Sequence, residues 1–218
     1  MGGGADMPGL HSICIDPRNS NQFCVGVSTG GLWITSDRGA SWPQRGEGMR
    51  AEHVPPDMTH DPIAQDVHCL VQCATQPQRM WVQHHNGIFV SSDEGRNFTE
   101  IQNVTPSAFG FPVAVHPREP DTAWFVPEIK DERRIPVGGK LAVTRTRDGG
   151  KTFDILTNGL PQHHAYDVVY GHALDLNETG NRLVMGSTTG GLWISENQGD
   201  SWSEITHTLQ PVYATRFV

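Results

Sequence analysis

One stretch of this sequence occurs twice, and it constrains the fold more than any other feature. Residues 28–42 read STGGLWITSDRGASW, and residues 187–202 read STTGGLWISENQGDSW. Two weaker copies lie between them, at residues 86–98 and 140–153. Repeats with a period of about 50 residues are typical of propellers and repeat arrays. The chain is therefore predicted to be a series of similar units.

Each copy combines a run of alternating apolar residues with an acidic or amide turn. Alternation with a period of two predicts a half-buried strand. In the turn, an Asp or Asn side chain can accept hydrogen bonds from backbone N–H groups, and the Gly that follows can adopt a positive φ. The acceptors are Asp37, Asp93, Asp148 and Asn197, and the aromatic residues that close the turns are Trp42, Phe98, Phe153 and Trp202. Each copy is therefore predicted to be a strand, a hydrogen-bonded turn and a second strand.

Strand patterns around the turns divide the chain into four blades of four antiparallel strands. The blades span about residues 10–50, 66–105, 108–160 and 163–209. Residues 211–218 read as one extra inner strand. We therefore predict an all-β fold, a single β-propeller over residues 1–218, whose four blades and extra strand belong to a larger ring or are completed by a homo-oligomer through open blade edges. The alternative is a compact four-bladed ring with a spare C-terminal segment.

The turn pattern resembles the Asp-box repeat, SxDxGxTW, of sialidases, some glycoside hydrolases, sortilin-type receptors and a photosystem assembly factor. The stretches FGFPVAVHP, GKLAVTRTRDGGKTF and GLPQHHAY are similar to a group of bacterial WD40/YVTN/BNR-like repeat proteins of no settled activity. Asn197 replaces Asp in the fourth copy, and Phe replaces Trp in two copies. The resemblance implies a propeller of the sialidase-like superfamily. It leaves the activity open, because many unrelated functions share this turn.

Charge and hydropathy argue against two kinds of partner. The formal net charge is −8, with 16 Lys and Arg against 24 Asp and Glu, whereas nucleic-acid binding needs clustered basic residues. The sequence has no apolar run of the length that crosses a membrane. Its first residues, MGGGADMPG, lack the basic and apolar regions of a signal peptide. We therefore expect no nucleic-acid or membrane partner and a cytoplasmic location.

Propeller topology places the turns at one end of the blades and the starts of the inner strands at the other. Histidines gather at this second end, where we predict a polar site at the top of the central channel: His11, His68, His84, His85 and His164. Imidazoles from different strands, with a carboxylate, can form an open site for a divalent transition metal such as Zn, Fe, Mn or Cu. The alternative is that these histidines are hydrogen-bonded structural residues and that the protein has no cofactor.

Two long loops, residues 43–66 and 126–139, bring further polar residues to the same end. The candidate catalytic residues are Asp66, Glu128, Asp131 and Tyr166, and the candidate ligand-binding residues are Arg133, Arg134, His60 and Phe111. Paired carboxylates are typical of glycosidases, but nothing here matches the sialidase set of three Arg, a Tyr–Glu pair and an Asp. We predict a hydrolase, glycosidase-like or metal-dependent, that acts on a glycan or small molecule. The alternative is a non-catalytic scaffold that docks a protein or glycan.

Overall fold

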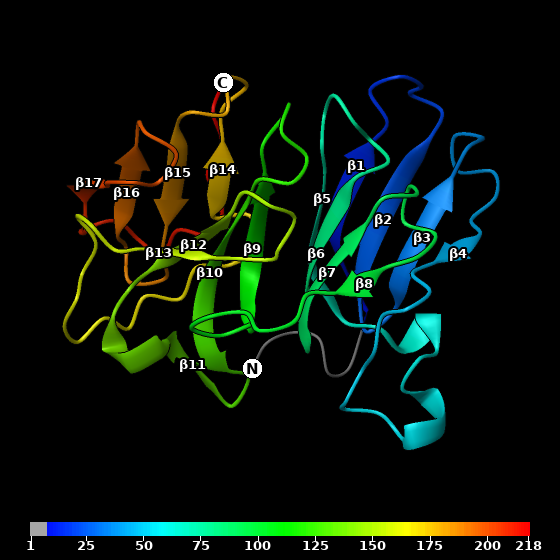
Figure 1. Ribbon diagram of the computed structural model, residues 1–218, viewed down its shortest axis with the longest axis horizontal. Coiled ribbons are helices and arrows are strands. Elements are labelled where there is room, and N and C mark those ends of the chain that lie inside the picture. The colour runs from blue at the N-terminus through cyan, green and yellow to red at the C-terminus, as the bar shows by residue number, and fades with distance from the viewer. Residues whose placement is uncertain (1–7) are drawn as a thin grey trace. The chain divides into compact units, whose positions relative to one another are not determined.

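The computed structural model describes residues 8–218, which form an all-β fold of four antiparallel blades (Figure 1). The chain divides into two compact units, of which the first ends at Ile101 and the second begins at Gln102. Each unit contains two blades, and in every blade the strands that neighbour each other in the sheet pair antiparallel. This is the blade organisation of a partial β-propeller.

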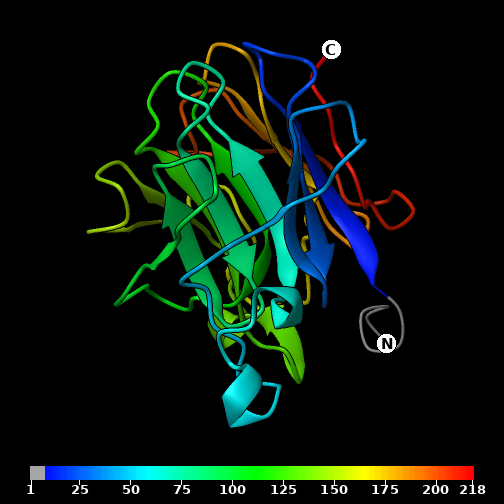
Figure 2. The same ribbon diagram turned by 90° about the vertical axis from the view of Figure 1, so that its right-hand side faces the viewer.

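The first unit contains blades one and two. Blade one consists of β1 (Gly9–Ile15), β2 (Phe23–Ser28), β3 (Gly31–Thr35) and β4 (Gln44–Arg45), and blade two of β5 (Val67–Gln72), β6 (Met80–His84), β7 (Gly87–Ser91) and β8 (Thr99–Glu100). The connecting loop carries two 3₁₀ turns, η1 (Pro56–Met58) and η2 (Pro62–Ala64). Figure 2 shows these turns, in cyan, at the end of the blades from which β1 starts. The long loop is therefore positioned at the end where the polar site is predicted.

The second unit contains blades three and four. Blade three consists of β9 (Gly110–Val115), β10 (Ala123–Lys130), β12 (Val143–Thr146) and β13 (Asp154–Leu156), and blade four of β14 (Leu174–Leu176), β15 (Leu183–Gly186), β16 (Leu192–Ser195) and β17 (Ser203–Thr206). A further strand, β11 (Arg133–Pro136), pairs with β10 and is followed by the 3₁₀ turn η3 (Val137–Gly139). The sequence predicted a loop here, and the structure instead extends β10 into a hairpin.

Each unit has its own apolar core between its two blades. Leu32, Met80 and Phe89 are fully buried in the first, and Trp124 and Trp193 are fully buried in the second. Burying side chains of this size contributes about 1.5–3 kcal/mol each. The predicted alternation of the strands therefore produces packing between neighbouring blades.

The four repeated turns have the hydrogen bonds that their sequence predicts. In the first, Asp37 Oδ1 accepts from Thr35 Oγ1 at 2.7 Å and from the Ser41 N–H at 2.9 Å. Hydrogen bonds from Ser41 and Thr35 lower the pKa of Asp37 to about 2. Asn197 replaces the carboxylate in the fourth turn and still accepts from Ser195 Oγ and the Ser201 N–H. The amide therefore preserves the turn.

Residues 211–218 lie beside blade four and form a single parallel bridge, His172–Ala214, in place of a regular strand. Whether the blades form part of a closed ring depends on how the two units are arranged, so the predicted ring stays a prediction. The helical turns among residues 8–218 are too short to span a membrane.

Candidate functional site

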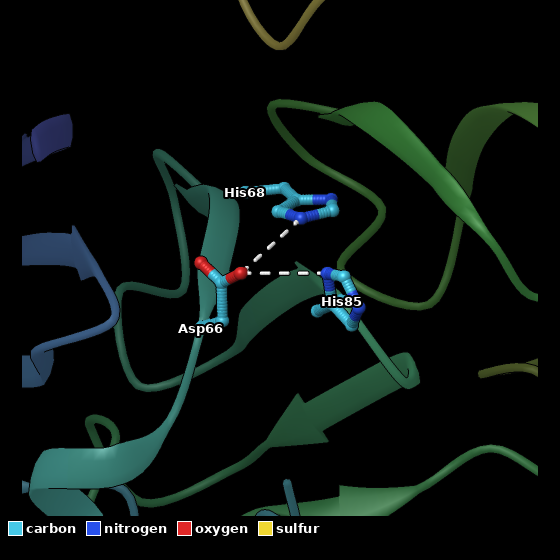
Figure 3. A group of neighbouring side chains, drawn as sticks. All are labelled: Asp66, His68 and His85. Atoms are coloured by element: carbon cyan, nitrogen blue, oxygen red, sulfur yellow. Dashed lines mark ion pairs between the residues drawn. The ribbon is translucent and has the colours of Figure 1, made fainter. Parts of the chain in front are cut away.

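Three side chains that can bind a metal meet at one end of blade two (Figure 3). Asp66 is the last residue before β5, His68 is the second residue of β5, and His85 lies in the turn between β6 and β7. Asp66 Oδ2 is 3.7 Å from His68 Nε2 and 3.4 Å from His85 Nδ1, and the three ligand atoms lie within 4.8 Å of one another. Asp66 and His68 are buried and His85 is half-buried.

A break in the strand register gives His68 its position. The pairing of β5 with β6 shifts between Val67 and Cys69, so His68 is the extra residue of a β-bulge. The pairing of β1 with β2 shifts in the same way around His11. A bulge turns a side chain away from the regular alternation of the strand. His68 can therefore face the site while its neighbours in β5 pack in the core.

Backbone contacts from both blades fix Asp66. Its N–H donates to His84 Nε2 and its carbonyl accepts from the His85 N–H, each at 3.0 Å. From blade one, the Thr29 N–H donates to Asp66 Oδ1 at 3.2 Å. Thr29 has a φ of 48°, a left-handed conformation that is costly for a β-branched residue. This strained turn orients the carboxylate so that Oδ2 faces the two imidazoles.

The electrostatics of the cluster suit a metal ligand set. Burial acts to raise the pKa of Asp66, but the imidazoles of His68 and His85 outweigh it and hold that pKa well below its usual value. The carboxylate is therefore ionised at neutral pH, as metal coordination requires. Burial lowers the pKa of the adjacent His84 to about 3, so its ring adds no positive charge beside the site.

The distances in the cluster also fit a metal. Nitrogen and oxygen ligands lie about 2.0–2.2 Å from a zinc ion, so neighbouring ligand atoms in a tetrahedron are about 3.3–3.6 Å apart. The observed separations of 3.4 and 3.7 Å are close to this range. Two imidazoles and one carboxylate leave a coordination position for water or substrate, and the same donor set binds Fe(II) in other proteins.

The other predicted metal ligands are not members of this group of three. Both ring nitrogens of His84 face backbone N–H groups, of Asp66 and of Asn86, at 3.0 Å, so His84 is not part of the group. His11 Nδ1 donates to the backbone carbonyl of His68 at 3.3 Å. His164 is an exposed residue of the second unit.

Two contributors to the site, the Thr29 N–H and the His53 ring, are not among the predicted site residues. Thr29 acts through its backbone N–H, which no sequence motif reveals. His53 lies on the long loop, with its ring centroid 5.3 Å from that of His85. No strand pattern or spacing links His53 to β5, so only the fold of the loop brings it to the rim of the site.

A second polar group forms in the second unit, at the β10–β11 hairpin. Arg134 Nε donates to Asp131 Oδ1 at 3.0 Å, and its guanidinium carbon lies 5.3 Å from the centre of the Phe111 ring. Glu128 is fully buried, and burial raises its pKa to about 8 against the opposing effects of Arg134 and the Val169 N–H. Within residues 8–218, neither carboxyl oxygen of Glu128 forms a hydrogen bond of normal geometry. Glu128 is therefore mainly protonated at neutral pH.

The remaining predicted residues are more peripheral. Tyr166 is 60% exposed, and Arg133 is exposed in β11. His60 Nδ1 donates to the Met49 carbonyl at 3.1 Å, which closes the long loop on itself. The structure thus brings Asp66, His68 and His85 together in one unit. In the other unit it brings Asp131 and Arg134 of the β10–β11 hairpin together with Phe111 of β9.

Comparison with known proteins supports a β-propeller and leaves the activity open. No family model matches the chain. The chain is 30% identical over 121 residues to sortilin of Rattus norvegicus, a match that covers 54% of this chain and 13% of sortilin. It therefore spans a small part of that relative.

Solved structures with a similar fold include proteins of different kinds. An ancestral GH74 enzyme superposes with a TM-score of 0.68 and 14% identity, over 91% of this chain and 24% of that chain. The β-propeller domain of Cps50 (Swd1) from Myceliophteria thermophila superposes with a TM-score of 0.60 and 12% identity, over 96% of this chain and 61% of that chain. Likeness at these identities reflects the fold alone.

Proposed function

We propose that this chain is an Asp-box β-propeller that binds a divalent transition metal through Asp66, His68 and His85 and is a hydrolase at that site. The observation that carries the proposal is the convergence of two imidazoles and one ionised carboxylate within 4.8 Å at one end of blade two. The substrate class that we propose is a glycan or another small molecule, in line with the enzyme among the proteins of similar fold.

The chemistry follows from the donor set. A metal held by two neutral imidazoles and one carboxylate supplies a Lewis acid and a bound water of lowered pKa. The strained Thr29 turn holds Oδ1 of Asp66, so Oδ2, which faces the two imidazoles, would be the oxygen that holds the metal. His53 lies at the rim, in a position to contact a substrate that reaches the metal.

Elemental analysis of the purified protein tests the metal site. We expect about one transition-metal ion per chain, lost in Asp66→Asn and in His68→Ala. His164→Ala is the matched control, because His164 is an exposed histidine of the other unit, and it should retain the metal. Equal metal content in the wild type and His68→Ala, or no metal retained after addition of Zn²⁺ or Fe²⁺, would refute the site.

Hydrolysis is tested separately, on chromogenic glycoside, ester and phosphoester substrates. Activity that is removed by a chelator, restored by the metal and absent in Asp66→Asn supports a metal-dependent hydrolase. Metal binding without turnover of any substrate class would leave a metal-binding scaffold in its place.

A scaffold that associates with a second copy is the other candidate function, and one observation favours it. Leu10, Ile13 and Ile15 on β1 are 58–60% exposed. When the register shifts of β1 and β5 are aligned, Leu10 corresponds to Val67 and Ile13 to Leu70. In blade two, Val67 and Leu70 are fully buried against blade one. The exposed row on β1, formed by Leu10, Ile13 and Ile15, is therefore an apolar surface of the kind that a neighbouring blade covers.

A further inference from the structure

Residues 211–218 follow blade four closely, although they form only one bridge. The Val212 N–H donates to the Ser187 carbonyl and the Thr215 N–H donates to the His172 carbonyl, each at 2.9 Å. Thr215 is buried and Val212 is half-buried. The segment is therefore a fixed part of the second unit.

In blade one, the corresponding surface of the sheet is covered by the innermost strand of the next blade. Gly26 of β2 pairs with Leu32 and faces the next blade. A β-carbon on Gly26 would lie 2.9 Å from Val67 Cγ1 and 3.4 Å from Leu70 Cβ. The innermost strand of blade two, β5, thus packs directly on this glycine through two residues that are three positions apart.

Blade four repeats this arrangement. Gly186 pairs with Leu192 of the second GGLWI stretch, as Gly26 pairs with Leu32 of the first. A β-carbon on Gly186 would lie 2.3 Å from Val212 Cγ1 and 3.4 Å from Thr215 Cγ2. Residues 212 and 215 therefore occupy on blade four the places that residues 67 and 70 occupy on blade one.

We propose that residues 211–218 are the innermost strand of a further blade and that their outer edge binds an extended, apolar peptide strand in antiparallel pairing. The N–H groups of Thr215 and Phe217 point inward, to the His172 carbonyl and to Asp175 Oδ2. Backbone groups alternate along an extended strand, so the N–H groups of Ala214 and Arg216 face the other edge. Neither forms a hydrogen bond in the part of the chain that the structure describes.

The second strand of each of the four blades indicates which kind of peptide this edge binds. In each blade the strand beside the innermost one is antiparallel and apolar, as in FCVGVS, MWVQH, AWFVPEIK and LVMG. The occupant that we infer is therefore an extended, apolar peptide strand of about four to eight residues, which binds by strand addition. This proposal does not depend on the metal site.

Fluorescence anisotropy with a labelled peptide tests the proposal. The probe is a synthetic peptide of residues 181–187, NRLVMGS, which contains β15, and its control is the same peptide with Val184→Pro. We expect the intact chain to bind the first peptide and not the second. In the protein, Ala214→Pro removes one outward N–H and should weaken binding by roughly tenfold, as the loss of one or two hydrogen bonds does.

Two further variants separate loss of the edge from loss of the fold. Ala214→Val retains the N–H and should bind the peptide like the wild type. Gly186→Ala displaces Val212 and should weaken binding while raising hydrogen exchange in residues 211–218 alone. Absence of binding, or equal binding by Ala214→Pro, would overturn the proposal. Self-association that disappears in Ala214→Pro would also overturn it, because a second copy would then occupy the edge.

Discussion

At the residue scale, Glu128 is a carboxyl group whose burial favours its protonated form at a pH where a carboxyl group in water is ionised. Its pKa is raised to about 8 by burial, whereas the usual value is 4.5. Between these two values the folded chain holds a proton that the unfolded chain has released. The free energy of unfolding should therefore fall as the pH rises from about 4.5 to 8, by at most about 1.4 kcal/mol per pH unit.

Urea denaturation of Glu128→Gln at several pH values measures this effect. The amide cannot ionise, so the variant should lose this part of the pH dependence and should be more stable than the wild type near pH 8. Glu178→Gln, at an exposed position, is the matched control and should retain the slope. An unchanged slope in Glu128→Gln would mean that Glu128 is ionised in the folded protein.

Asp93 gives a second prediction at this scale. Its Oδ1 accepts from Ser91 Oγ at 2.8 Å and from the Asn97 N–H at 2.9 Å. Asp93→Ala should lower the free energy of unfolding by about 1–2 kcal/mol, as the loss of a comparable cap does. Asp57→Ala, an exposed loop variant, should change it little. Metal content and activity should be unaffected, and loss of either at unchanged stability would show that Asp93 is not a structural residue.

Two adjacent histidines, His84 and His85, have different surroundings although their sequence positions suggest the same role. His84 and His85 were both predicted as ligands because they are neighbours at the end of blade two where the polar site is predicted. Strand geometry sends successive side chains to opposite faces, and here His84 packs beside Phe89 while His85 faces Asp66. Asp66 was predicted as a catalytic residue, and its position between two imidazoles makes it a candidate ligand. Pairwise geometry of this kind is set by loops and bulges, which leave little trace in sequence.

At the scale of elements, the long loop is more ordered than its length suggests. Met49 and Ala51 are fully buried, and Arg50 forms two hydrogen bonds of 2.7 Å to Glu100 of β8. The strands were predictable from the period-two pattern and the turn residues. The loop was not, because its order depends on contacts with blade two that have no periodicity.

Arg50→Met tests the role of this ion pair. Because Arg50 is partly exposed, the free energy of unfolding should fall by less than about 1 kcal/mol. Hydrogen exchange across residues 46–66 should become faster, and metal affinity should change little, because the three proposed ligands lie outside the loop or at its end. Unchanged exchange would show that the buried Met49 and Ala51 hold the loop without the ion pair.

At the scale of the whole molecule, the exposed row on β1 predicts self-association. Ile13→Lys places a charge in the middle of the row and should shift the sedimentation equilibrium towards the monomer. Ile205→Lys, at a similarly exposed isoleucine of blade four, is the control and should leave the equilibrium unchanged. A wild-type chain that is monomeric at all concentrations would show that a second copy does not cover this face.

The contact between Thr29 and Asp66 links two blades at the candidate site. The N–H that orients the carboxylate belongs to blade one, whereas the three candidate ligands belong to blade two or, in the case of Asp66, immediately precede its first strand. The geometry of the site is therefore a joint property of two adjacent blades. Blade two without blade one would keep the three candidate ligands and lose the hydrogen bond that orients the Asp66 carboxylate.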